Sequence, residues 1–271
     1  MADRVVAHQG AACWATLFTH AHYLPCLAVL LQSMRACQTR YPLVVMVTET
    51  VDARTRERLA RMGCVLRDVD AWRVPHADGS LAFERFQNVW TKLRAFELYE
   101  YERVVMIDSD MLMCHNMDEL FDLPLKRGMI AAAFACTCNP KQIPTYPAEW
   151  TPRNCGYALR PHPPNDARQL TKPTHRLINS GVVVLEPSQE QQDEIHTFIL
   201  RHTERLAQYR FPDQDLLADV YRDRIQVLPW YYNALKTLRQ CHPDLWNDGE
   251  ARIIHYLSLI HISEPTRLGM I

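Results

Sequence analysis

Hydrophobic positions change period repeatedly along the first part of the chain, which predicts alternating strands and helices. Apolar, β-branched runs predict buried strands at residues 13–18, 43–48, 64–69 and 104–107. Between these runs, apolar residues recur at helical spacing over residues 24–34, 51–62 and 93–99. Four strands alternating with three helices predict an α/β fold, with a mostly parallel central sheet flanked by helices.

The middle of the chain has a different composition. Residues 137–173 hold eight prolines and little periodicity, which predicts a long ordered insertion or lid. Regular structure is expected again as a strand at 181–185, a short helix near 216–220, and strands at 225–228 and 252–257. Ser188, with Gln191 three residues later, has capping-box spacing and predicts the start of another helix. That helix is expected to carry apolar residues on one face: Ile195, Phe198, Ile199 and Leu206.

No internal repeat or linker divides the sequence, so we expect a single domain over residues 1–257. The chain has 271 residues, 48% of them hydrophobic, which is enough for a substantial core. Its 30 basic and 31 acidic residues are interspersed, so we expect no nucleic-acid partner. We also expect no membrane span and no signal peptide, and therefore a cytoplasmic protein.

Nine cysteines, an odd number, are scattered along the chain, which predicts buried free thiols rather than a disulfide framework. The eight glycines never fall at the spacing of a dinucleotide-binding or P-loop fingerprint. One interpretation of the insertion is a zinc site, although Cys-x-Cys with irregular partners is a weak signal. Its ligands would come from residues within the insertion or just beside it: Cys136, Cys138, Cys155, His162 and His175. The other reading is a lid over an acceptor site, in which Tyr146 and Trp150 either face a sugar ring or pack the lid.

Asp-x-Asp triplets occur at 68–70, 108–110 and 213–215, and only the second directly follows a buried apolar run. That position places Asp108 and Asp110 at the carboxyl end of a central strand, the edge at which open α/β sheets bind ligands. Two carboxylates this close repel each other unless a cation lies between them, and a hard divalent cation prefers oxygen ligands. The alternative is a helix-capping aspartate followed by a solvated one.

Six segments, in order and spacing, resemble the retaining glycosyltransferases of family eight, which include glycogenin and the plant galactinol synthases. They are 90–96 (WTKLRAF), 108–110 (DSD), 116–121 (NMDELF), 178–184 (INSGVVV), 213–215 (DQD) and 255–256 (HY). The resemblance covers about residues 12–257. It implies a GT-A fold, a UDP-sugar donor, Mn²⁺ and transfer of a hexose to a hydroxyl acceptor (a sugar, polyol or glycan) with retention.

The resemblance also implies roles for single residues. Asp108, Asp110 and His255 correspond to the metal ligands, a donor set that Mn²⁺ accepts. Without the resemblance, His255 would be read as a buried histidine on a strand. Residues implied to bind the donor nucleotide and phosphates are Thr16, Leu17, Thr19, Tyr23, Lys92 and Ser109, and a surface lysine is the alternative for Lys92.

Sugar-binding and catalytic roles fall on the later segments. Asn179 and Ser180 correspond to residues that hold the sugar, on a turn that Gly181 would permit before the strand. Asp213 corresponds to a hydroxyl acceptor that orients the ring, and Gln214 to the side chain nearest the anomeric carbon. Lys92 completes the implied catalytic group.

The sequence departs from the family after His255. Residues 258–271 look like a translated sequencing adapter, and the family's Lys-Pro-Trp, whose lysine contacts the donor phosphates, is missing. We therefore expect a non-native tail there and keep, as an alternative function, a nucleotide-sugar-binding protein with little or no turnover. A purely structural domain would require every match to be coincidence. A homodimer stays open.

Overall fold

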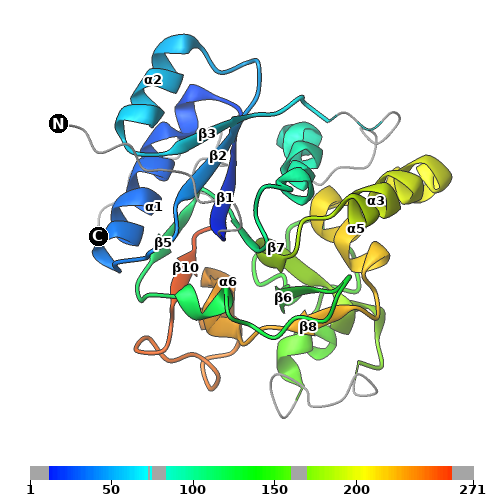
Figure 1. Ribbon diagram of the computed structural model, residues 1–271. Coiled ribbons are helices and arrows are strands. Elements are labelled where there is room, and N and C mark those ends of the chain that lie inside the picture. The colour runs from blue at the N-terminus through cyan, green and yellow to red at the C-terminus, as the bar shows by residue number, and fades with distance from the viewer. Residues whose placement is uncertain (1–11, 73, 75–83, 160–169, 258–271) are drawn as a thin grey trace.

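A seven-stranded sheet forms the centre of the computed structural model, which describes residues 12–72, 74, 84–159 and 170–257 (Figure 1). Its strand order is β3-β2-β1-β4-β7-β6-β8. The strands are β1 (Cys13–Phe18), β2 (Leu43–Val47), β3 (Val65–Asp68), β4 (Val104–Ile107), β6 (Ile130–Phe134), β7 (Ile178–Leu185) and β8 (Ile225–Val227).

Most neighbouring strands are parallel, as predicted. β3, β2, β1 and β4 pair in parallel, and so do β6 and β8, whereas β7 runs antiparallel to both β4 and β6. The mixed α/β fold is therefore confirmed. The turn expected before Gly181 is wrong, because β7 already begins at Ile178 and the Gly181 carbonyl accepts a hydrogen bond from the Asp108 amide.

Strand β6 was not predicted from the sequence. Three of its five residues are alanines, which have low strand propensity and give no β-branched signal. Its burial comes from its neighbours, since it lies between β7 and β8.

A second, three-stranded sheet has the order β5-β10-β9, with β5 (Met111–Met113), β10 (Ile253–His255) and β9 (Ala234–Leu235). Strand β10 is antiparallel to β5, with His255 opposite Met111. This pairing joins the end of the described chain to the segment that follows β4. Of these three short strands, the sequence predicted only β10.

Helices cover both faces of the main sheet, and the alternation along β4 shows how. Val105 and Ile107 pack into an apolar cluster with α1 (Leu24–Ala36) and α2 (Ala53–Arg61). Val104 and Met106 face the opposite cluster, which contains η2 (Glu84–Glu97), α3 (Gln189–Arg201) and α5 (Pro212–Val220). In Figure 1 these two groups of helices lie on opposite sides of the sheet.

Two helix predictions need correction. Ser188 caps α3 as expected, accepting a hydrogen bond from the Gln191 amide, but α3 ends before His202, so Leu206 lies on the separate helix α4 (Thr203–Leu206). The helix expected over 93–99 is the 3-10 helix η2, and Tyr99 lies beyond its end.

The remaining elements are short: η1 (Ala21–Tyr23), η3 (Asp118–Leu120), η4 (Pro152–Asn154), η5 (Gly156–Ala158), η7 (Pro173–Arg176), η8 (Trp230–Asn233) and α6 (Lys236–Cys241).

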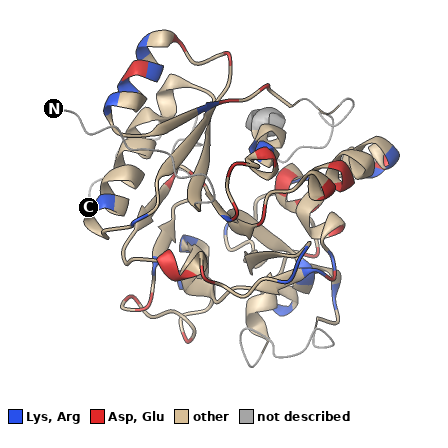
Figure 2. Ribbon diagram, in the orientation of Figure 1, with Lys and Arg blue, Asp and Glu red and all other residues tan. Residues whose placement is uncertain are grey.

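The described part of the proline-rich insertion, 137–159 and 170–173, contains turns, η4, η5 and the first residue of η7. Its role as a lid stays a prediction. Acidic and basic residues are both distributed over helices and loops (Figure 2). None of the helices within the described ranges is long and apolar enough to cross a membrane. Each of the nine cysteines is a free thiol.

Candidate donor and metal site

A cavity of about 690 Å³ opens where β1 and β4 end at their carboxyl edge. Every residue to which the family resemblance gives a donor, metal or catalytic role lines it: Thr16, Leu17, Thr19, Tyr23, Lys92, Asp108, Ser109, Asp110, Asn179, Ser180, Asp213, Gln214 and His255. Segments far apart in the sequence thus meet at the edge where open α/β sheets bind ligands.

Two carboxylates and an imidazole meet on one side of this cavity. Asp108 follows β4 and Asp110 precedes β5, and the pairing of β10 with β5 brings His255 beside them. His255 Nε2 lies 3.6 Å from Asp108 Oδ2 and 3.5 Å from Asp110 Oδ1. Their ligand atoms all lie within 4.8 Å of one another, as a shared divalent cation requires.

The orientation of the His255 ring is fixed by Asn233, which the sequence analysis did not assign. His255 Nδ1 lies 3.0 Å from Asn233 Oδ1, and Asn233 Nδ2 donates to Asn179 Oδ1 at 2.8 Å. Because this amide's oxygen faces the ring, Nδ1–H donates to it, and Nε2 is the ring nitrogen directed toward the carboxylates. Metal-binding histidines are typically held this way, so the residues present fit a divalent cation.

Lys92 is buried, with only 5% of its surface exposed, so the surface-lysine alternative is wrong. Its Nζ lies 2.6 Å from Asp108 Oδ1 and 3.5 Å from Asp213 Oδ2, and it donates to the Ser180 carbonyl at 2.7 Å. Burial alone would lower the pKa of Lys92, but the carboxylates of Asp108 and Asp213 outweigh it and the pKa is raised. Lys92 is therefore charged, and it links Asp108 of the candidate metal site to Asp213 in the first turn of α5.

A neighbouring wall is built from β7 and the first turn of α5. Ser180 Oγ donates to Asp213 Oδ2 at 2.6 Å, and Asn179 Nδ2 lies 3.4 Å from Gln214 Oε1. Four short polar side chains are thus held in two pairs at the cavity surface. Such pairs can present hydroxyl acceptors and an amide to a bound ring.

In the other two Asp-x-Asp triplets, Asp68 and Asp215 have local partners outside this wall. Asp68 pairs with Arg56 on the surface. Asp215 Oδ2 accepts from the amides of Arg210 and Phe211 at 2.9 and 2.8 Å. Only the 108–110 triplet therefore combines two carboxylates with a histidine among the described residues.

The third wall comes from the end of β1 and η1. Thr16 is 1% exposed and, within the described ranges, its hydroxyl has no hydrogen-bond partner. An unpaired buried hydroxyl at a cavity wall can be satisfied by a ligand. Tyr23 stacks at a tilt on His22, with ring centroids 4.1 Å apart, and His20 and His22, which sequence reasoning missed, also line the cavity.

Residues 15–260 match the family model described as glycosyl transferase family 8. The chain belongs to this family. It is 26% identical over 259 residues to Galactinol synthase 5 of Arabidopsis thaliana, covering 94% of this chain and 74% of that protein. It is 27% identical over 230 residues to Galactinol synthase 2 of Solanum lycopersicum, covering 84% of this chain and 64% of that protein.

Solved structures agree on the fold of this family 8 glycosyltransferase. The galactosyltransferase LgtC, in complex with donor and acceptor sugar analogs, matches with a TM-score of 0.61 over 91% of this chain and 87% of that one. At 16% identity this likeness shows the fold alone. The GT-A fold expected from the sequence is confirmed.

The proline-rich insertion of this family 8 chain contacts the start of α5 through an aromatic cluster. The Trp150 ring stacks on Phe211, with centroids 4.9 Å apart and planes 9° apart, and Tyr146 packs edge-on against both rings. One face of Trp150 is thus used for packing, which favours the packing interpretation of these aromatics. Phe211 was not predicted, because it lies outside the insertion.

The predicted zinc ligands of the insertion are only partly brought together. Cys136, Cys138 and Cys155 are close in space, and the imidazole beside them belongs to His242. His175 Nδ1 instead accepts a hydrogen bond from the backbone amide of nearby Lys172, 3.4 Å away. His162 and the tail, 258–271, lie outside the described residues.

Proposed function

We propose that this chain transfers a hexose from a UDP-sugar to a hydroxyl acceptor with retention at the anomeric carbon, using Mn²⁺. The observation that carries the proposal is the arrangement of Asp108, Asp110 and His255 in one cavity, next to Asp213 and Gln214. A cation site next to a polar wall suits a donor with a diphosphate at one end and a sugar at the other.

Mn²⁺ would be held by the carboxylates of Asp108 and Asp110 and by Nε2 of His255, and when bound it would supply positive charge for the donor's diphosphate. Asn233 keeps the imidazole in the tautomer and orientation needed for this. Ser109, between the two aspartates, and Lys92 are assigned to the donor end, beside the phosphates.

The sugar end is assigned to β7 and α5. Lys92 and Ser180 both contact Asp213 Oδ2, which leaves Oδ1 as the atom we assign to a sugar hydroxyl. Gln214, held by Asn179, is assigned to the anomeric side. An amide there can stabilise a developing positive centre through its oxygen, and it is a poor covalent nucleophile.

The nucleotide end is assigned to Thr16, Leu17, Thr19 and Tyr23. The Thr16 hydroxyl offers an unused hydrogen bond, and the Tyr23 ring offers a face for a base. Since the curated relatives are galactinol synthases and one structural neighbour is a galactosyltransferase, UDP-galactose is the first donor to test.

The test is UDP release from UDP-hexoses, with and without Mn²⁺, by wild type and by Asp110→Asn. We expect Mn²⁺-dependent release from wild type and none detectable from the variant, because losing one carboxylate removes a charged ligand from the cation. Asp70→Asn, at an exposed aspartate of another triplet, is the matched control and should behave as wild type. The anomeric configuration of the product, read by NMR, tests retention.

Equal Mn²⁺ affinity of wild type and Asp110→Asn by calorimetry would contradict the metal assignment. Stabilisation of the wild-type protein by NAD or ATP, but not by UDP-sugars with Mn²⁺, would contradict the donor assignment, since a ligand stabilises the state that binds it. Binding without turnover is not favoured, because the family consists of glycosyltransferases. A cytoplasmic location, a homodimer and the boundaries of the domain stay predictions.

A further inference from the structure

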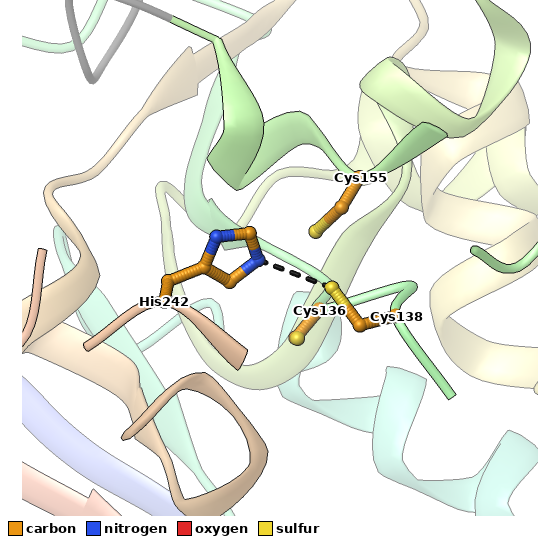
Figure 3. Close-up of side chains that lie close together, drawn as sticks. All are labelled: Cys136, Cys138, Cys155 and His242. Carbon is orange, nitrogen blue, oxygen red and sulfur yellow. Dashed lines mark hydrogen bonds between the residues drawn. The ribbon is translucent and has the colours of Figure 1, made fainter. Parts of the chain in front are cut away.

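Four side chains of types that bind metals come together from three separate segments and form a group distinct from Asp108, Asp110 and His255 (Figure 3). Cys136 and Cys138 follow β6, Cys155 lies between η4 and η5, and His242 follows α6. Their three Sγ atoms and one imidazole nitrogen lie within 4.8 Å of one another. Cys138 Sγ is 3.1 Å from His242 Nε2.

The surroundings of this cluster are apolar. The exposed fraction is 9% for Cys136, 3% for Cys138, 0% for Cys155 and 9% for His242. Phe134, Tyr157, Trp230 and Leu238 belong to the same buried apolar cluster as the thiols. A single buried thiol can pack as a small apolar side chain. An imidazole nitrogen that lies among three thiols in an apolar environment needs a polar partner, because burying an unpaired polar group costs free energy.

We propose that Cys136, Cys138, Cys155 and His242 bind one structural Zn²⁺. Tetrahedral zinc with Zn–S bonds of about 2.3 Å and Zn–N bonds of about 2.0 Å separates its ligand atoms by roughly 3.5 to 3.8 Å. That spacing falls inside the 4.8 Å limit of the cluster. Three thiols and one imidazole fill all four positions, which is the closed pattern of a structural site rather than a catalytic one.

The two metal sites of the chain would select different ions. Thiolate ligands favour zinc, whereas the carboxylates of Asp108 and Asp110 favour harder ions such as Mn²⁺. The zinc proposal therefore does not rest on the proposed transferase activity, and either can fail alone.

The position of the cluster indicates what the zinc would do. Cys136 lies just before the insertion, Cys138 and Cys155 lie within it, and His242 belongs to the segment that leads back to β10. Cys136 also lines the donor cavity, together with Asn139, Tyr146 and Trp150 of the lid. A zinc ion here would cross-link the base of the lid to α6 and hold the lid over the cavity.

The first measurement is the metal content of the purified full-length protein, expressed with zinc in the medium and desalted. We expect about one zinc per chain by plasma mass spectrometry, retained in Asp110→Asn and in Cys114→Ser, which changes an exposed thiol outside the cluster. Cys155→Ser and His242→Ala should each lose most of the zinc.

Cys241 needs its own variant, because its thiol also interacts with Cys136 and Cys138. Cys241→Ser should keep the zinc. If Cys241→Ser loses zinc while His242→Ala keeps it, the ligand set proposed here is wrong.

Two measurements need no variant and remain informative if the substituted chains fail to fold. Cobalt substitution should give the thiolate-to-metal charge-transfer and visible bands of a tetrahedral site. A zinc-selective chelator should lower Tm by several degrees, and added Zn²⁺ should reverse this while Mn²⁺ should not, since zinc binding contributes folding free energy. Wild-type protein that neither contains nor takes up zinc, that holds a disulfide among these cysteines, or that carries iron instead would overturn the proposal.

Discussion

The imidazole of His255 occupies the space that a side chain at position 181 would need. A β-carbon on Gly181 would lie 2.5 Å from His255 Cε1, 2.6 Å from Nδ1 and 2.7 Å from Asn179 Oδ1. Atoms do not approach this closely, so the glycine in the INSG segment is required by the neighbouring ring and not by a turn. The candidate metal ligand and the sugar-binding strand are therefore fitted to each other.

Gly181→Ala should displace the His255 ring and weaken the metal site. We expect at least a tenfold loss of Mn²⁺ affinity by calorimetry and a loss of about 1–3 kcal/mol in unfolding free energy, typical of overpacking. Gly249→Ala is the control, because its added β-carbon would meet only Asn247 Oδ1 at 3.4 Å in an exposed turn. Unchanged Mn²⁺ affinity in Gly181→Ala would show that the ring position does not matter for the metal.

Asn233 and His255 illustrate what the sequence could not predict. The first strands, the aspartates after β4 and the polar residues of β7 follow from hydrophobic runs and from motifs within short segments. The contact between Asn233 and His255 depends on the pairing of β9 with β10, two short strands without a periodic pattern. The His242 contribution to the cysteine cluster was missed for the same reason, because 86 residues separate it from Cys155 along the chain and only the tertiary fold joins them.

Asn233→Ala should lower Mn²⁺ affinity about 10- to 100-fold, the usual effect of removing a residue that orients a metal-binding histidine. The ring would lose the acceptor for its Nδ1 proton, while all three ligand side chains remain present. Calorimetry measures the affinity, and Asn247→Ala, at an exposed asparagine, is the control. A variant with normal Mn²⁺ affinity but reduced stability would mean that Asn233 is only structural.

Lys92→Met should destabilise the protein strongly. The substitution leaves Asp108 and Asp213 without their shared cation, and an unpaired buried charge typically costs about 3–5 kcal/mol. Saturating Mn²⁺ should recover part of the loss, because a bound cation again neutralises Asp108. Urea denaturation with and without Mn²⁺ measures both effects, with the exposed lid residue Lys141→Met as control. A loss below about 1 kcal/mol would place Lys92 among ordinary surface ion pairs.

Asp215 should make the stability of the protein fall as the pH rises from about 4 to 7. Burial raises the pKa of Asp215 to about 7 from its ordinary 3.8, although the amides of Phe211 and Arg210 oppose this, while Asp213 and Asp219 add to it. Between these two pKa values the folded chain holds a proton that the unfolded chain has released. Stability contributed by that proton is therefore complete below about pH 4 and lost as the pH rises through 7.

Asp215→Asn tests this directly, because the amide oxygen can still accept from the backbone of Arg210 and Phe211 while the ionisation is gone. We expect the difference in Tm, variant minus wild type, to grow between pH 5 and pH 7.5. This pH range follows from the pKa of about 7 for Asp215 in the folded protein. At still higher pH the carboxylate is ionised in both states, so the difference should become constant and provides an internal control. A Tm difference that does not change with pH would mean that Asp215 keeps its charge in the folded protein, held there by the two amides.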